Sequence, residues 1–168
     1  MIVIDVGCAR HGWHYSIERL LDEFHPDVFY GFDPGWEPEM FWPSPDLDPK
    51  TRVEITKAAA WTYDGEVGFH ENGLVSHVTE LNGVPKVPCF DLARFLRVMA
   101  FKHREGIVLK IDAEGAEYDL LRHLIARRAD KLLKLAIVEW HDLPDGTHIS
   151  RRVNIEREIA CELREWEF

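Results

Sequence analysis

The amino-acid sequence predicts an α/β fold, with an open, mostly parallel, doubly wound sheet and helices on both of its faces. Two observations support this prediction. Short apolar runs, some of them rich in β-branched residues, alternate with amphipathic stretches along the chain, and this alternation is typical of parallel α/β sheets. The 168 residues also contain no internal repeat, low-complexity tract or long linker, so we expect residues 1–168 to form a single domain.

Three strands and one helix are predicted in the first part of the chain. Residues 2–6 (IVIDV) form a short apolar run, which is typical of a buried strand. The stretch 15–24 has apolar residues at helical spacing, with Ser16 as a candidate N-cap. Residues 28–33 (VFYGFD) and 53–60 (VEITKAAA) have the composition of further strands.

The second part of the chain continues the alternation. A weak hairpin pattern near 66–71 precedes a predicted helix over about 91–102, with Asp91 as its cap. The remaining predicted elements are strands over 107–112 and 133–140 and helices over 114–128 and 151–165. In such a sheet, ligands bind outside the carboxyl ends of the strands, so the candidate site lies there.

The stretch 34–50 differs from the rest of the chain. It contains five of the nine prolines, so no regular element is expected within it. It also carries Trp36, Phe41 and Trp42, which a solvated loop rarely does. We therefore expect this loop to cover a site or an interface.

Composition excludes several classes of protein. The net charge of −10 argues against general nucleic-acid binding, although the stretch 86–134 is locally basic. No apolar run approaches the roughly 20 residues that span a bilayer, and the apolar start without a basic leader does not resemble a signal peptide. The chain has three widely spaced cysteines, Cys8, Cys89 and Cys161. This odd number favours a reduced, cytoplasmic setting over a disulfide framework.

The first strand leads into a glycine-containing turn, DVGCARHG, over residues 5–12. Gly7 and Gly12 would let the backbone turn tightly and bring its amide hydrogens close to a ligand. The same turn could simply join a strand to a helix. It lacks the G-x-G-x-x-G dinucleotide fingerprint, which disfavours a nucleotide-dependent oxidoreductase.

The next two strand ends also carry candidate ligand-binding residues. Asp33 lies roughly 20 residues beyond the glycine turn, the position at which an acidic side chain accepts hydrogen bonds from the ribose hydroxyls in nucleotide-binding folds. Alternatively, Asp33 caps a turn. The third strand ends in small residues that include Ala60, which leave room for a flat base, and then in Trp61. Trp61 would stack on the base or pack in the core.

The segment 109–117 is the most specific in the chain. Within six residues it contains Asp112, Glu114 and Glu117, after a lysine, Lys110, inside an apolar strand. Helix capping and the helix dipole explain acids at such a position, but this density of acids exceeds what capping needs.

The segment KIDAEGAEYDLL resembles the signature of FkbM-type methyltransferases, whose usual form is close to KIDVEGAEYEVL. DVGCARHG, YGFDP, KAAAW, CFDLARFL and IVEWH resemble the family's other segments in order, so the resemblance extends from about Ile4 to His141. It implies a class I, Rossmann-like domain that binds S-adenosylmethionine and methylates a hydroxyl of a sugar or other small metabolite. In that case Asp5, Gly7 and Gly12 shape the cofactor turn, Asp33 holds the ribose, and Asp112, Glu114 and Glu117 line the site.

The sequence departs from the family pattern in two ways. The first turn has one more residue between its glycines than the usual form. If 151–165 is a helix, the sheet also lacks its last strands, and we then expect an exposed edge that the final helix or a second copy of the chain covers.

Methyl transfer to a hydroxyl benefits from a base that takes its proton. His141, at the end of the strand over 133–140, is the first candidate, with Asp112 and Glu139 beside it and His70 and His77 as less favoured candidates. The spacing requires no metal ion, although an ion held by Asp112, Glu139 and His141 is an alternative. Cofactor binding without turnover and an oxidoreductase remain the other functions considered.

Overall fold

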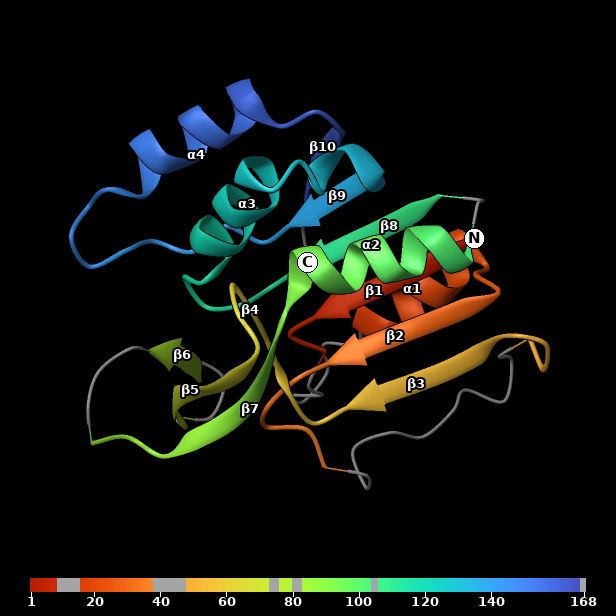
Figure 1. Ribbon diagram of the computed structural model, residues 1–168, viewed down its shortest axis with the longest axis horizontal. Coiled ribbons are helices and arrows are strands. Elements are labelled where there is room, and N and C mark those ends of the chain that lie inside the picture. Colours follow the sequence, from red (N-terminus) through yellow and green to blue (C-terminus); the bar gives the residue numbers. More distant parts are fainter. Residues whose placement is uncertain (9–15, 38–47, 73–75, 80–82, 104–105, 167–168) are drawn as a thin grey trace.

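The computed structural model describes residues 1–8, 16–37, 48–72, 76–79, 83–103 and 106–166. Its main feature is a six-stranded sheet in which all strands are parallel, with the order β10-β9-β8-β1-β2-β3 (Figure 1). The strands are β1 (Ile2–Val6), β2 (Val28–Phe32), β3 (Arg52–Thr56), β8 (Ile107–Ile111), β9 (Leu133–Val138) and β10 (Glu162–Glu165). The predicted α/β class is confirmed.

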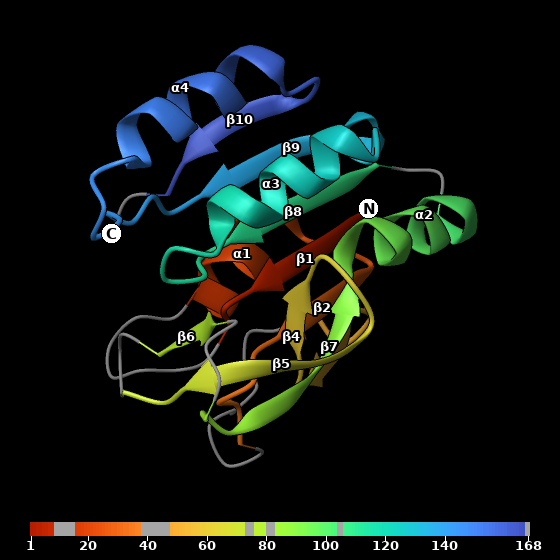
Figure 2. The same cartoon turned by 60° about the vertical axis from the view of Figure 1, so that its left-hand side comes forward.

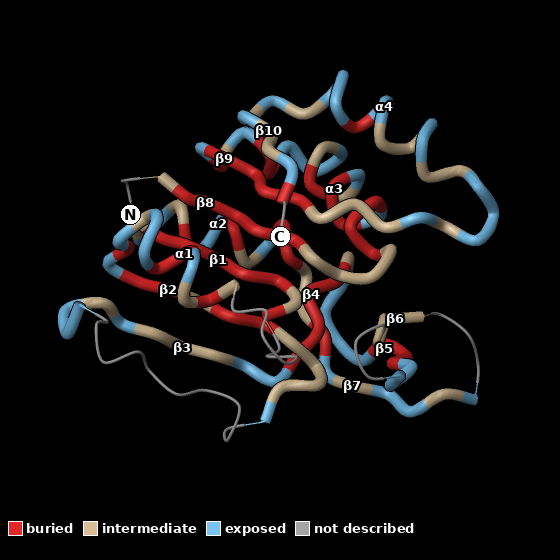
Figure 3. Tube along the Cα trace, turned by 180° about the vertical axis from the view of Figure 1, so that it is seen from behind, coloured by how far each residue is buried: buried red, intermediate tan, exposed pale blue. Residues whose placement is uncertain are grey.

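The central strands are the most deeply buried part of the molecule (Figure 3). Every residue of β1 and of β8 is buried, which explains why both read as nearly continuous apolar runs. Val3 and Ile4 of β1 point to opposite faces, where they join two separate hydrophobic clusters.

Helices pack on both faces, as the sequence predicts. On one face, α1 (Ser16–Phe24) buries Ile17 and Leu20 in the same cluster as Val3. The opposite face carries α2 (Leu92–Lys102), α3 (Glu117–Ala126) and α4 (His148–Glu158), which contribute Leu96, Leu120 and Ile155 to the cluster of Ile4 (Figure 2). A short 3₁₀ turn, η3 (Asp130–Leu132), connects α3 to β9.

A second, four-stranded sheet with the order β4-β7-β5-β6 lies beside the carboxyl ends of β1 and β2 (Figures 1 and 2). Its strands are β4 (Ala59–Trp61), β5 (Gly65–His70), β6 (His77–Thr79) and β7 (Lys86–Asp91). β5 and β6 pair antiparallel, with His70 opposite His77. The stretch 66–71, where the sequence indicates a hairpin, is therefore almost entirely one strand of this antiparallel pair and not a hairpin by itself.

The prediction of one strand over 53–60 is wrong. The chain turns after Thr56, whose carbonyl oxygen accepts a hydrogen bond from the amide of Ala58 at 2.9 Å. The residues before this turn belong to β3 in the first sheet, and those after it form β4 in the second.

The predicted helix over 151–165 is confirmed only as far as residue 158, because residues 162–165 form a strand. α4 ends at Glu158, because Ile159 adopts an extended conformation, and β10 then pairs in parallel with β9. The described chain therefore supplies a sixth strand beyond the five that we expected. Both edge strands, β3 and β10, are short and carry exposed charged residues, a pattern that discourages edge-to-edge pairing.

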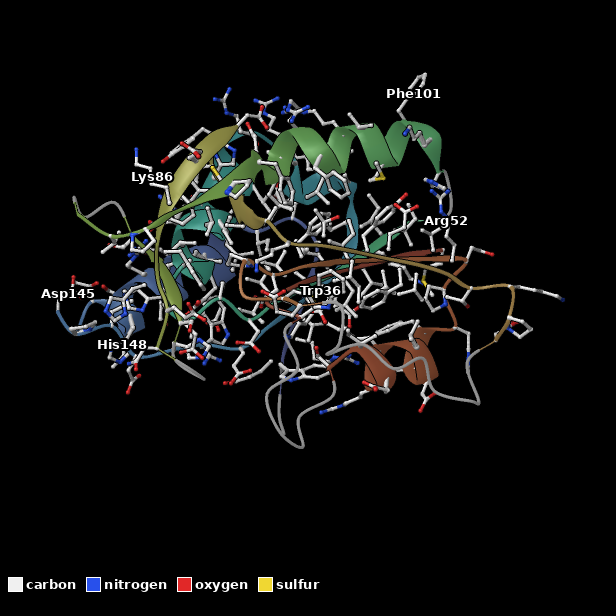
Figure 4. All side chains as sticks on the ribbon, turned by 90° about the horizontal axis from the view of Figure 1, so that it is seen from below. Trp36, Arg52, Lys86, Phe101, Asp145 and His148 are labelled. Atoms are coloured by element: carbon white, nitrogen blue, oxygen red, sulfur yellow. The ribbon has the colours of Figure 1, made fainter. Side chains whose placement is uncertain are left out.

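The helices of the described ranges are short, with at most eleven residues. None of them is long and apolar enough to cross a membrane. Few large apolar side chains are exposed; the most exposed of those described is Phe101, which points outward at the end of α2 (Figure 4).

Candidate functional site

The candidate site is formed where the parallel strands end. The backbone pairing continues one residue past each strand: the amide of Gly7 donates to the carbonyl oxygen of Phe32 at 2.9 Å, and that of Asp112 donates to Val6 at 2.9 Å. The amide of Glu139 likewise donates to Ile111 at 3.0 Å. Gly7, Asp112 and Glu139 therefore sit on a rigid hydrogen-bonded frame rather than on free loops.

A pocket opens at this edge between the two sheets. Its volume of about 170 Å³ is roughly ten times what one water molecule needs, so it has room for an organic group. The six-stranded sheet and the loop after β8 form one side, and the second sheet forms the other. The lining residues are Val6, Gly7, Phe32, Asp33, Pro34, Gly35, Ala59, Ala60, Phe69, Glu71, Ser76, His77, Val78, Asp112, Ala113, Glu114 and Ala116.

Gly7 is required by geometry at the floor of this pocket. Its φ is +81°, and a Cβ built on it would lie 1.7 Å from the backbone carbonyl oxygen of Asp112. Any side chain would therefore overlap the neighbouring strand end. The glycine lets the turn after β1 approach the turn after β8 closely.

The other predicted cofactor residues divide into those in the pocket and those away from it. Asp33 lines the pocket, and its Oδ1 accepts a hydrogen bond from the amide of Gly35 at 2.7 Å, so it caps a turn as well. Ala60 also lines the pocket, whereas Trp61 is buried in the core and does not. Gly12 lies outside the described residues.

Asp5 is fully buried beneath the pocket rather than in its wall. Ser16 donates a hydrogen bond to its Oδ2 at 2.7 Å, and the Nζ of Lys110 lies 3.3 Å from its Oδ1. The same ammonium donates to Asp112 Oδ2 at 3.0 Å and to the carbonyl oxygen of Gly7 at 3.3 Å. Lys110, the unusual lysine within an apolar strand, therefore links three residues at the ends of β1 and β8.

Burial and charge shift the pKa of both members of this pair. Burial raises the pKa of Asp5 by more than the nearby Lys110 lowers it. For Lys110, burial lowers the pKa, but Asp5 and Asp112 raise it by more, and the net shift is upward. The lysine is thus held in its charged form.

Beside the pocket, three carboxylates surround one imidazole nitrogen. The Nε2 of His141 lies 3.5 Å from Glu114 Oε1, 3.7 Å from Glu139 Oε1 and 3.8 Å from Asp112 Oδ1. These are the three predicted catalytic residues, Asp112, Glu139 and His141, together with Glu114. Glu114 is itself in the left-handed region, with φ of +48°.

Glu117 supports this group from behind. Its side chain is completely buried, and its Oε1 accepts a hydrogen bond from the amide of His141 at 2.9 Å. Its Oε2 accepts one from the amide of Gly115 at 2.8 Å, and Oε1 also lies 3.4 Å from His141 Nδ1. Glu117 therefore ties the turn after β8 to the segment after β9, a long-range role that its place in the sequence does not reveal.

The carboxylates alter the protonation of the group. Burial lowers the pKa of His141, but Glu117, Glu114 and Asp112 raise it by more, to about 9. Burial and the adjacent Asp112 raise the pKa of Glu139 to about 7. At neutral pH the imidazole therefore carries its proton in the ligand-free protein, which is the opposite of the state that a general base needs.

Apart from Ala60 and the less favoured candidate His77, the sequence does not indicate the side chains that the second sheet supplies to the site. Phe69, Glu71 and His77 line the pocket opposite Asp112, and His77 stacks on His70 with ring centroids 5.3 Å apart. The sequence makes both histidines candidates, but only the pairing of β5 with β6 brings one of them, His77, to the pocket.

Comparisons with models of protein families, with curated proteins and with solved structures found no match to this chain.

Proposed function

We propose that the protein is a Rossmann-like, class I methyltransferase that binds S-adenosylmethionine in this pocket and methylates a hydroxyl of a sugar or other small metabolite. The family resemblance of the KIDAEGAEYDLL segment suggests the activity. The observation that carries the proposal is the pocket itself, which lies at the carboxyl ends of parallel strands and is bounded by Gly7, Asp33 and the Asp112–Glu114 turn.

The pocket's residues fit the chemical parts of this cofactor. Gly7 lines the pocket and has no side chain, so its backbone would contact the ligand. Asp33 offers a carboxylate to a ribose diol. The apolar wall for the adenine base is formed by Phe32, Ala59, Ala60, Phe69 and Val78.

When bound, S-adenosylmethionine would supply an electrophilic methyl group on its sulfonium. The chain's own contribution is to hold the acceptor oxygen in line and to receive its proton. We assign the proton to the two carboxylates of this group: Asp112 Oδ1 and Glu139 Oε1 lie 3.8 Å and 3.7 Å from His141 Nε2, and the protonated imidazole holds them around the acceptor. The acceptor then binds between this group and the second sheet.

Calorimetric titration with S-adenosylmethionine and S-adenosylhomocysteine, with NAD as control, tests the cofactor. Asp33→Asn removes the charge but keeps an oxygen for the turn at Gly35, so it should weaken binding by about 1–3 kcal/mol. Asp22→Asn, on the exposed side of α1, is the matched control and should bind normally. Binding of NAD alone, or of none of the three compounds, would refute the proposed cofactor.

Turnover is tested separately, with a panel of hydroxylated acceptors and detection of S-adenosylhomocysteine. His141→Ala should retain cofactor binding and lose turnover, because it removes the imidazole that holds the proton-accepting carboxylates of Asp112 and Glu139 in place. Full activity in that variant would exclude the imidazole from catalysis. Binding without turnover for every acceptor would instead favour a cofactor-binding module.

A further inference from the structure

The group beside the pocket has the arrangement of a metal-binding site. One atom each from Asp112, Glu114 and His141 can be chosen so that all three lie within 4.8 Å of one another. Glu139 Oε1 joins them at 3.7 Å from the imidazole Nε2. The group therefore combines one imidazole nitrogen with carboxylate oxygens from two neighbouring strand ends, β8 and β9.

The separations are those of atoms that share a cation rather than those of hydrogen bonds. Nε2 lies 3.5–3.8 Å from the three carboxylate oxygens, beyond the usual 2.7–3.2 Å of an N–H···O bond. Ligand atoms at about 2.0–2.2 Å from one ion are roughly 3–4.4 Å apart. Small side-chain rotations would thus complete coordination.

A second set of contacts holds the prospective ligands in place. The fully buried Glu117 accepts a hydrogen bond from the amide of His141 at 2.9 Å, and its Oε1 lies 3.4 Å from Nδ1. This is the side of the ring on which metal-bound histidines have an acidic partner, and it leaves Nε2 on the side of the other carboxylates. The ammonium of Lys110 donates a hydrogen bond to Asp112 Oδ2 at 3.0 Å, and this leaves Asp112 Oδ1 on the side of the imidazole. The hydroxyl of Tyr118 donates to the carbonyl oxygen of His141 at 2.8 Å and anchors its backbone.

An independent observation concerns Glu139. Its Oε2 is buried and has no hydrogen-bond partner among the described residues, although leaving a buried carboxylate oxygen unsatisfied is costly. An ion bound by both carboxylate oxygens of Glu139 beside the imidazole would satisfy Oε2 and reduce the repulsion among the acids that surround it.

We infer that Asp112, Glu114 and His141 bind a divalent transition-metal ion, with Glu139 as a fourth ligand. The imidazole selects ions such as Mn²⁺ and Zn²⁺ over Ca²⁺, which prefers oxygen alone. Metal binding itself does not depend on the cofactor. The ion's role does rest on the proposed function: since Asp112 and Glu114 also line the pocket, an ion there would bind the acceptor hydroxyl and lower its pKa. Asp112, Glu139 and His141 would then act as ligands of the ion rather than as proton acceptors.

Titration of the metal-stripped full chain with Mn²⁺ and with Zn²⁺, without cofactor, tests the site. Calorimetry, with electron paramagnetic resonance for Mn²⁺, should give one bound ion per chain. Glu114→Gln and His141→Ala should each weaken binding at least tenfold. Asp142→Asn removes one negative charge from an exposed carboxyl next to His141, so it is the matched control and should bind normally.

Circular dichroism and thermal melting of Glu114→Gln would establish that the variant is folded. No bound ion, equal binding by Glu114→Gln and the control, or preference for Ca²⁺ over both transition ions would each overturn the inference. Asp33→Asn separates the two proposals: it should impair cofactor binding but leave the Mn²⁺ affinity unchanged.

Discussion

Lys110→Met is the substitution for which the structure predicts the largest effect on stability. The ammonium is completely buried, 3.3 Å from Asp5 Oδ1 and 3.0 Å from Asp112 Oδ2, and it donates to the carbonyl oxygen of Gly7. Methionine approximates the shape of lysine without its charge. The variant therefore leaves the fully buried Asp5 without its counter-ion.

Removing one partner of a buried ion pair costs about 3–5 kcal/mol, and we take this range because Asp5 has no access to solvent. We add nothing for Asp112, which is 21% exposed and can be hydrated. For a chain of this length, 1 kcal/mol corresponds to roughly 2–4 °C in Tm. The expected decrease in Tm is therefore roughly 6–20 °C.

The assay is urea and thermal unfolding followed by circular dichroism, with Lys134→Met as the matched control. Lys134 lies in the neighbouring strand β9 but is exposed, so its replacement should change stability by less than about 0.5 kcal/mol. The double variant Asp5→Asn/Lys110→Met should lose less than the sum of the two single variants. A loss below about 1 kcal/mol for Lys110→Met, or strict additivity, would refute the ion-pair reasoning.

Three further predictions concern the frame around the site. Gly7→Ala should lower the free energy of unfolding in urea by about 2–4 kcal/mol, because the new Cβ overlaps the carbonyl oxygen of Asp112 and the residue has a positive φ. The control Gly83→Ala, which has a positive φ but open space around it, should lower it by only about 1 kcal/mol. Equal losses in the two variants would contradict the overlap. Asp91→Ala should cost about 1–2 kcal/mol at neutral pH, since Asp91 caps α2. Burial raises the pKa of Asp91, but its hydrogen bonds lower it by more. Its contribution to the free energy of unfolding is therefore present above about pH 4 and should disappear as the pH falls through the lowered pKa. A stability difference between the wild type and Asp91→Ala that persists in acid would refute this. Burial raises the pKa of the Cys161 thiol to about 11. Because the thiolate is the reactive form, alkylation of Cys161 at about pH 8 should be roughly a hundredfold slower in the folded protein than in the unfolded chain. Equal rates would contradict this prediction.

The parts of the fold that the sequence predicts are those fixed by local periodicity. The buried β1 and β8 and the amphipathic α1 are visible as apolar patterns because each contacts the core with a regular period. The turn after Thr56 and the strand β10 are not visible in this way. No glycine or proline marks that turn, and β10 is an edge strand whose polar residues become a strand only by pairing with β9.

The site is predictable to a similar extent and for a similar reason. Parallel strands bring their carboxyl ends to one edge, so Asp33, Asp112 and His141 could be expected near a common site. The burial of Asp5 away from the pocket and the anchoring role of Glu117 depend on contacts between residues far apart in sequence. The pocket wall from the second sheet also depends on such contacts, because β5, β6 and β7 assemble only through pairing.

The charge balance of the site connects the two proposals. Two basic side chains, Lys110 and His141, face more acids than they can neutralise; the acids are Asp5, Asp112, Glu114, Glu117 and Glu139. An excess of negative charge at partly buried positions destabilises the ligand-free protein and favours any ligand that brings positive charge. A sulfonium in the pocket and a divalent ion between the strand ends both meet this requirement. Because Asp112 and Glu114 face both positions, the same electrostatic excess supports both ligands.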